Sequence, residues 1–564
     1  MGIKGFSAWL RTTFPHVFCP IPTGQSGSRS QALHFDQVYI DLNPFLHLAA
    51  RQSRGIDEVV KICRKNLKLA VQTLTRPASM VYVSMDGPAP LAKLPEQRAR
   101  RQDAAVTAAK RDTFDAQQIT PGCLAMTTIE AQVYGLLREI FFTSGKVGAS
   151  QAADFKAVID GSGVEGEGEF KIIRKVLHDH VDQDALRGRV IRAILACDAD
   201  LFLQALLSDV PHLYLFDPFA PHNSPSTIFS VDRWRRSLAD GFGDESGRRI
   251  AFDFVLIALM SGSDYAPALK YANYRSLWPA YLEFNQKTRE FKRTKLSEQS
   301  SNAFTIVSAD KKTLNLGVLK DFFDFYVRES LTETLREPLK VSHEELDASG
   351  KDERILDYLE HLIWNLDALV TCKVADLSIS LETDKIAPSL LELSDFDVEK
   401  LQRLLDERLK KNDAKTCRIE SVKYPGVMAL MALDRSTECQ EFLAEPLRPL
   451  MKELKDSASG LALIESDSEL VRELTKRIDS IPKESFSLIE KLATFPRAPI
   501  ELTKSVANTP EAANFYTMAM KSGLNDTQTD ALELPWMRPY VYAVNEEESW
   551  RCPLHRMLFS KYRK

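Results

Sequence analysis

The order of apolar and polar positions predicts an α/β architecture for the first half of the chain. Beyond Phe35, apolar runs typical of strands alternate with stretches whose apolar residues recur every three or four positions, as on an amphipathic helix. Helices are expected at residues 56–74, 95–114 and 170–177. This alternation is typical of a mostly parallel, twisted sheet flanked by helices. The strand-like runs end at Asp41, Asp86, Asp198 and Asp264.

After about residue 300 the pattern becomes helical almost throughout. Residues 288–301 are polar and rich in lysine, as in a linker between two halves. We therefore expect two domains, residues 1–300 with the α/β sheet and residues 301–564 with a mostly helical fold. The helices expected in the second half are residues 314–331, 355–370, 398–411, 428–454 and 469–493.

The aspartates that end the strand-like runs predict a shared acidic pocket. In open α/β sheets, ligands bind outside the carboxyl ends of the strands, so side chains that follow several strands converge there. Residues 164–171 add Val-Glu-Gly-Glu-Gly-Glu-Phe-Lys, in which glycine lets the backbone come close and Mg²⁺ finds oxygen ligands. An isolated segment of this kind is more simply a flexible acidic loop. The acids that follow the other strands favour a metal site.

The sequence Asp198-Ala-Asp200 predicts a pair of carboxylates. On an extended segment both side chains lie on the same face, because strand side chains alternate with a period of two. Turn or helix-cap aspartates are the alternative. Like charges that are half-buried require a compensating cation, and counting Glu167, Glu169 and Asp264 with this pair favours metal binding.

A stripe of polar donors lies just downstream of Asp86. Its members fall at positions i, i+4, i+7 and i+8 and therefore share one helix face. A solvated charged face is the ordinary explanation, whereas a phosphate pocket is the functional one, since guanidinium forks and a lysine charge suit a terminal phosphate. His47, six residues beyond Asp41, is either structural or able to stack on a base. The stripe consists of Lys93, Gln97, Arg100 and Arg101.

Composition narrows the class of protein only slightly. The chain has 44% hydrophobic and 27% charged residues and a formal net charge of −5, as in an ordinary globular protein. Its eight cysteines form no C-x₂-C pair, so neither a zinc site nor a disulfide framework is expected. No apolar run is long enough for a membrane span. We expect a soluble intracellular protein with no membrane partner; nucleus and cytoplasm both stay open, as do its protein partners.

With these residues assembled, the chain resembles the Xrn family of 5′→3′ exoribonucleases, within the flap-endonuclease-like (PIN-like) nuclease superfamily. The matching stretches occur in the family's order over roughly residues 1–270. The second half resembles the family's second conserved region more weakly, because its aromatic-rich block is reduced. Trp364 is a weak candidate for the aromatic that would stack on a base opposite His47, and its place on an apolar helix face favours a core residue instead. The matching stretches are Met1-Gly-Ile-Lys-Gly-Phe, Tyr39-Ile-Asp-Leu-Asn, Met85-Asp-Gly-Pro, Gln97-Arg-Ala-Arg-Arg, Glu165-Gly-Glu-Gly-Glu-Phe-Lys, Asp198-Ala-Asp-Leu and Gly262-Ser-Asp-Tyr.

The resemblance implies a function and a role for each candidate residue. It implies hydrolysis of single-stranded RNA with a 5′-monophosphate, from 5′ to 3′, to mononucleotides, with Mg²⁺ as cofactor and Mn²⁺ as an alternative. Lys93, Gln97, Arg100 and Arg101 would select the 5′-phosphate, and His47 would stack on the terminal base. A flap-type DNA endonuclease and a non-catalytic RNA-binding scaffold are the alternatives. The implied catalytic and metal-binding acids are Asp41, Asp86, Glu167, Glu169, Asp198, Asp200 and Asp264.

Overall fold

The computed structural model describes most of the chain between Ile3 and residue 507. The part of the expected helical domain that follows residue 507 lies outside the described residues. None of the helices within this described part is long and apolar enough to cross a membrane. The described residues are 3, 5–20, 35–143, 154–187, 190–196, 198–217, 219, 227–240, 244–263, 266–295, 305–307, 314–331, 350–372, 387–414, 422–433, 438–456, 459–464 and 466–507.

A single eight-stranded sheet forms the centre of the molecule, in the order β1-β7-β6-β5-β2-β3-β4-β8. The five inner strands from β6 to β4 are parallel to their neighbours, and β7, β1 and β8 add antiparallel edges. The expected mostly parallel sheet is therefore confirmed. The strands are β1 (Phe18–Pro20), β2 (Phe35–Asp41), β3 (Pro77–Ser84), β4 (Lys156–Asp160), β5 (Arg192–Leu195), β6 (Leu213–Phe216), β7 (Thr227–Ser230) and β8 (Ile500–Leu502).

The register of the central strands brings their carboxyl ends to one edge of the sheet. Asp41 at the end of β2 lies opposite Ser84 at the end of β3, and Ser84 lies opposite Asp160 at the end of β4. On the other side of β2, Ile40 pairs with Leu195, the last residue of β5. Four adjacent strands therefore deliver the segments that follow them to the same place.

Both faces of the sheet are buried, as a parallel sheet requires. Alternate residues of one strand enter different cores: Tyr39 belongs to the core beneath α6 to α9, whereas Val38 and Ile40 belong to the core beneath α2, α3 and α5. The helices of the first half are α1 (Phe6–Thr13), α2 (Asn43–Arg51), α3 (Ile56–Leu69), α4 (Leu94–Arg111), α5 (Leu124–Arg138), α6 (Gly168–Arg187), α7 (Ala199–Leu207), α8 (Val231–Ala239), α9 (Asp244–Leu259) and α10 (Tyr274–Lys295).

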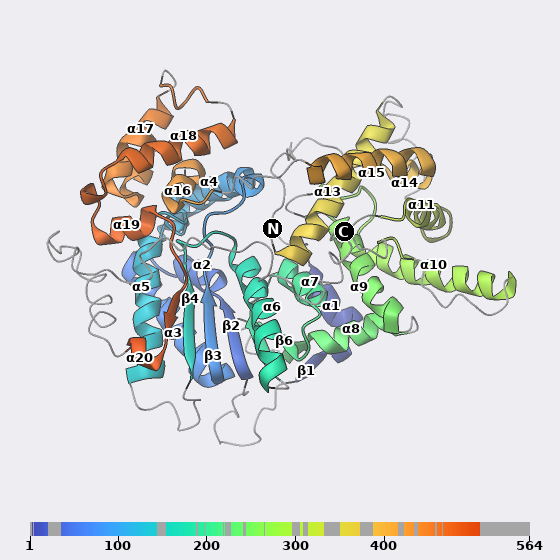
Figure 1. Ribbon diagram of the computed structural model, residues 1–564, viewed down its shortest axis with the longest axis horizontal. Helices are drawn as coiled ribbons and strands as arrows, with labels where there is room; N and C mark the ends of the chain where they lie inside the picture. The colour runs from blue at the N-terminus through green and yellow to red at the C-terminus, as the bar shows by residue number, and fades with distance from the viewer. Residues whose placement is uncertain are drawn as a thin grey trace.

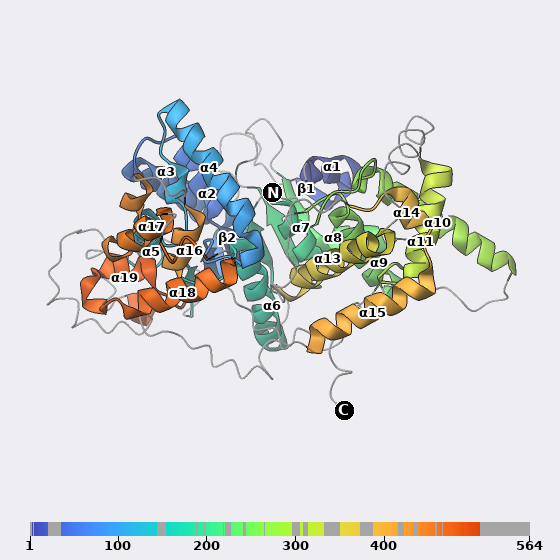
Figure 2. The ribbon, with the colours of Figure 1, turned by 90° about the horizontal axis from the view of Figure 1, so that it is seen from above.

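The helices after residue 300 lie in two separate places (Figures 1 and 2). Those from α11 to α15 join α7, α9 and α10 around a shared core. Helices α16 to α18 pack beside α4 around a smaller core that also contains Ala89, Leu91, Leu94 and Cys123 from the first half, and α19 packs against α5 and α16. The chain then returns to the sheet as β8, which pairs with β4. The second-half helices are α11 (Leu316–Phe325), α13 (Lys351–Thr371), α14 (Leu390–Ser394), α15 (Val398–Ala414), α16 (Pro425–Ala432), α17 (Arg448–Lys455), α18 (Asp467–Ser480), α19 (Leu488–Thr494) and α20 (Lys504–Ala507).

The structure corrects four expected elements. The run ending at Asp264 is no strand: residues 255–259 are the last turns of α9, because a short buried apolar run fits either element. Residues 288–295 continue α10 and are not a linker. The helix expected at 428–454 is interrupted between α16 and α17, and that at 469–493 breaks between α18 and α19, where Pro482 lies. Proline removes an amide donor and ends helices.

Candidate active site

Asp41 and Asp86 are joined by one amide side chain at the ends of β2 and β3. Asn43, the first residue of α2, donates from Nδ2 to Asp41 Oδ1 at 2.9 Å and to Asp86 Oδ1 at 2.8 Å. Its Oδ1 accepts the backbone N–H of Asp86 at 3.2 Å. The two predicted acids are therefore brought together. Asn43 stands in a stretch that the sequence singled out, but nothing in the residue spacing revealed its bridging contacts.

The glycine-acid stretch approaches this pair through its backbone. Gly168, which begins α6, donates its N–H to Asp86 Oδ1 at 2.8 Å. A Cβ at Gly168 would lie 2.8 Å from Asn43 Nδ2 and 3.1 Å from Asp41 Oδ1. A Cβ at Gly87 would collide with the carbonyl oxygen of Val164. Glycine at these two positions is what lets the acidic stretch and the strand ends meet.

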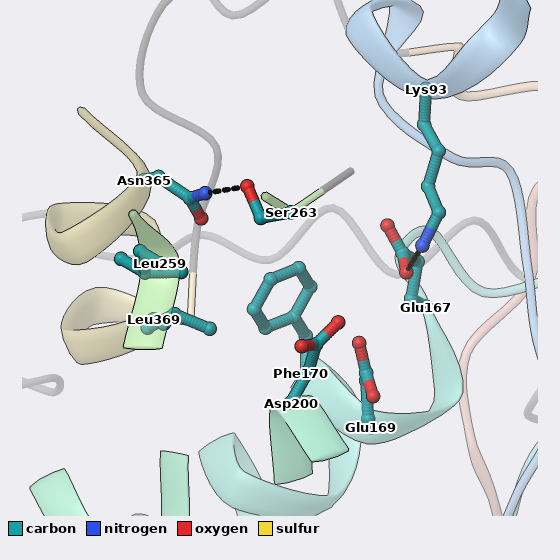
Figure 3. A pocket seen from close by; sticks show the side chains of 9 residues that line it. All are labelled: Lys93, Glu167, Glu169, Phe170, Asp200, Leu259, Ser263, Asn365 and Leu369. Carbon is teal, nitrogen blue, oxygen red and sulfur yellow. Dashed lines mark hydrogen bonds and ion pairs between the residues drawn. The ribbon is translucent and has the colours of Figure 1, made fainter. Parts of the chain in front are cut away.

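Glu167, Glu169 and Asp200 face a common hollow with Lys93 (Figure 3). Glu167 ends the loop before α6, Glu169 lies in the first turn of α6, and Asp200 lies in the first turn of α7. The ammonium group of Lys93 is paired with Glu167, and both side chains are buried. The hollow is completed by Phe170 and by residues from α9, α13 and the turn after α9, namely Leu259, Ser263, Asn365 and Leu369.

Burial and mutual repulsion perturb the acids. Burial raises the pKa of Asp41 well above its ordinary value, and the neighbouring Asp86 and Asp198 charges raise it further. Burial likewise raises the pKa of Glu169, followed by the charges of Asp200 and Glu167, against which Lys93 acts. These carboxylates favour protons unless another cation stabilises their ionised forms.

The donor set fits a hard divalent cation in its chemistry. The side chains are carboxylates and an amide, the oxygen ligands that Mg²⁺ prefers. Within the described part of the chain, however, no three of its His, Cys, Asp and Glu side chains stand close enough to hold one ion together. Asn43 and Lys93 supply the hydrogen bonds and positive charge between the acids. Asp264 lies outside the described residues.

One predicted geometry is wrong in detail. Asp198 and Asp200 do not share an extended segment: Asp198 is the N-cap of α7 and Asp200 belongs to its first turn. Aspartate is favoured at an N-cap, and the apolar residues that follow continue a buried helix. Asp198 makes no capping hydrogen bond with its side chain. The alternative interpretation of Asp198 as a helix-cap residue is therefore correct. Asp198 nevertheless lies close enough to Asp41 to raise its pKa.

The donor stripe runs along the start of α4, beside the acids. Gln97 and Arg101 are buried, and Arg101 donates from Nε to Thr120 Oγ1 at 2.7 Å. The buried Oε1 of Gln97 has no hydrogen-bond partner within the described structure. Arg100 is exposed and pairs with Glu96. The stripe thus combines two buried cations, Lys93 and Arg101, with the unbonded amide oxygen of Gln97 and the exposed cation of Arg100.

His47 lies on α2, close enough to Asp86 and to Arg100 and Arg101 for their charges to affect its pKa. Burial lowers the pKa of His47 to about 4, helped by the charge of Arg101 and opposed by that of Asp86. Its ring is therefore neutral at physiological pH, as suits stacking on a base. Trp364 is buried in the core shared by α9 and α13, as expected from the sequence.

Comparison with known proteins finds a family model that matches the first part of the chain. Residues 1–217 match the model described as the XRN 5′-3′ exonuclease N-terminus. The first 217 residues are therefore similar to the N-terminal part of XRN exonucleases. The matched part contains six of the seven predicted acids and all of the donor stripe, whereas Asp264, Asn365 and Leu369 lie beyond it.

Individual relatives agree with this match. The 5′-3′ exoribonuclease 1 of Schizosaccharomyces pombe is 26% identical over 309 residues, which is 48% of this chain and 22% of that protein. The 5′-3′ exoribonuclease 2 of Neurospora crassa is 25% identical over 277 residues, 40% of this chain and 25% of that protein. The chain thus spans about a quarter or less of the length of these curated relatives.

Among solved structures, the catalytic core of Rad2 in complex with a DNA substrate is similar at 14% identity, over 73% of this chain and 98% of that one. The TM-score is 0.34.

Proposed function

We propose that this protein is a divalent-metal-dependent 5′→3′ exoribonuclease that degrades single-stranded RNA carrying a 5′-monophosphate to mononucleotides. One observation carries the proposal: four adjacent strand ends bring buried carboxylates against a helix that presents a cation and an amide. The match of this region to the XRN exonuclease N-terminus supports it.

Mg²⁺, or Mn²⁺ in its place, would be held by Asp41, Asp86, Glu167, Glu169, Asp198, Asp200 and Asp264. When bound, such ions activate water and stabilise the attacking and leaving oxygens of a phosphodiester. The acids would act as ligands, because Asp41 and Glu169 are buried near other carboxylates and stay ionised only beside cations.

The substrate's 5′ end would be held by α4 and α2. Arg101 and Arg100 offer guanidinium groups to the terminal phosphate, Gln97 adds an amide, and Lys93 adds a charge beside Glu167. The neutral ring of His47 stacks on the first base. A phosphate pocket beside a metal site would set the cut one nucleotide from the end.

A time course on one 3′-labelled RNA with three 5′ ends tests the proposal. We expect the monophosphate form to disappear in Mg²⁺ and to persist in EDTA, while the hydroxyl and triphosphate forms persist in both. Asp198→Asn should abolish decay, whereas the matched control Asp112→Asn should not, because Asp112 is 85% exposed at the far end of α4.

The donor stripe needs its own variants. Arg101→Lys keeps the charge but loses the planar fork, so the preference for monophosphate should fall, while Lys110→Gln on the exposed part of α4 should leave it unchanged. Equal decay of all three RNAs would refute the phosphate assignment. Cleavage of a DNA flap junction instead would favour the flap-endonuclease alternative, and RNA binding without decay would favour a scaffold.

A further inference from the structure

We propose that Arg497 and Glu130 are positioning residues that hold the metal-binding acids in place. Arg497 lies between α19 and β8, far beyond the part of the chain that matches the XRN family, and Glu130 lies on α5. The inference rests on the proposed function, because it concerns the metal site that the proposed nuclease reaction requires.

The two side chains form a buried, two-pronged ion pair, called here the Arg497–Glu130 brace. Arg497 Nη1 lies 2.6 Å from Glu130 Oε1, and Nη2 lies 2.8 Å from Oε2. The side chains are only 6% and 4% exposed. Paired bonds of this geometry fix orientation as well as distance, and only arginine supplies them.

The Arg497–Glu130 brace hydrogen-bonds to the loop that follows β4, at residues 162 and 163. Glu130 Oε2 accepts the backbone N–H of Ser162 at 3.1 Å and its hydroxyl at 3.2 Å. Arg497 donates its own backbone N–H to the carbonyl of Gly163 at 2.8 Å. A Cβ at Gly161 would lie 2.3 Å from the carboxyl carbon of Glu130, and one at Gly163 would lie 2.3 Å from Arg497 Nε. Both glycines are therefore needed for the loop to lie against the brace.

The loop bound by the brace continues directly to Glu167 and Glu169. Gly166 exchanges backbone hydrogen bonds with residues 87 and 88 at 2.9 Å, just after Asp86. Glu167 follows at once, and Gly168 binds Asp86. On the other side of Arg497, β8 pairs with β4, and Figure 1 shows this red strand running beside β4. A shift of the brace would therefore move Glu167 and Glu169 relative to Asp41 and Asp86.

Metal affinity measured without RNA tests the brace. Mn²⁺ alone is titrated into the full chain and the free ion is followed by electron paramagnetic resonance. The test variants are Arg497→Lys, which keeps the charge but loses the fork, and Glu130→Gln, which keeps the shape but loses the charge. Substituting residues that orient metal ligands typically lowers metal affinity by about 10- to 100-fold. We therefore expect both variants to bind Mn²⁺ at least about ten-fold more weakly than the parent.

A matched control separates positioning from general loss of stability. Arg354 pairs with the buried Glu392 at 2.6 Å on α13 and α14, away from the loop, so Arg354→Lys removes a similar bond without touching the acids. We expect its Mn²⁺ affinity to equal that of the parent. The preference for 5′-monophosphate over 5′-hydroxyl RNA should survive in all three variants, because the brace does not touch α4.

Unchanged Mn²⁺ affinity in a folded brace variant, or equal loss in the control, would overturn the inference. If Arg497→Lys does not fold, the Mn²⁺ affinity of Glu130→Gln alone tests the inference. If the parent binds Mn²⁺ but degrades no RNA, the proposed function fails, and the brace is still judged by the Mn²⁺ affinities. A parent that binds no Mn²⁺ overturns the brace.

Discussion

Replacing Gly168 by alanine should disable the site without unfolding the protein. An added Cβ would lie 2.8 Å from Asn43 Nδ2, which must then move. That amide hydrogen-bonds to both Asp41 and Asp86. A hydrogen bond to a charged group contributes about 1.5–3 kcal/mol, so losing one of the two costs roughly that amount. Gly168 is the first residue of α6, so alanine there regains at most the about 0.5–1 kcal/mol that it gains over glycine in the middle of a helix, which leaves a net destabilisation of about 0.5–3 kcal/mol.

The matched control is Gly317→Ala, near the start of α11. A Cβ there meets only Asn315 Oδ1 at 3.4 Å and Val398 at 4.0 Å, which are ordinary contacts. This variant should be slightly more stable than the parent and equally active. Urea unfolding in EDTA measures the stabilities, and decay of 5′-monophosphate RNA with a Mn²⁺ titration measures the site. A Gly168→Ala protein with parental Mn²⁺ affinity and parental activity would refute the argument that close backbone approach builds the site.

Three further predictions follow from the same geometry. His47→Phe should keep RNA decay within a few-fold because it keeps a neutral ring, while His47→Ala should raise KM about ten-fold, since stacking contributes about 1–3 kcal/mol per base; equal KM values would contradict this. The pKa of His47 is lowered to about 4, so the neutral ring contributes fully to the free energy of unfolding above about pH 6.5, and this contribution is lost as the pH falls toward 4. Melting temperatures of the parent and of His47→Phe from pH 4 to 7 measure this loss, which only the parent should show. Burial raises the pKa of Asp41 and Glu169, so in EDTA their contribution to the free energy of unfolding is present at acid pH and is lost as the pH rises through the raised pKa values. Mg²⁺ should therefore increase the melting temperature more at pH 8 than at pH 5. An equal increase at both pH values would count against the metal site.

The sequence alone was enough to predict the convergence of Asp41 and Asp86. Each follows an apolar run of strand length, and parallel strands have their carboxyl ends at one edge. The same logic failed for the run before Asp264, because the unbroken apolar residues from Val255 to Met260 fit a buried helix as well as a buried strand. Burial without alternation leaves no period to distinguish the two elements.

The residues that connect the acids could not be predicted, because their partners are distant in sequence. Glu130 and Arg497 are separated by 367 positions, and only the fold makes them neighbours. Strand β8 has three residues inside a helical stretch, which is too short to show a period. Asn43 was visible as part of a motif, but its bonds depend on the register of β2 and β3.

The second half of the chain is therefore part of the site's construction. Asn365 of α13 donates to Ser263 Oγ at 2.5 Å beside the hollow. Arg98 of α4 is held by the carbonyl of Met431 at 2.8 Å and by Asp467. Since the cores on both sides contain apolar side chains from after residue 300, a division at that residue would expose them to water. The proposed boundary at residue 300 can separate the two sequence patterns, but the strand ends, the donor helix and the acidic loop each depend on contacts from beyond it.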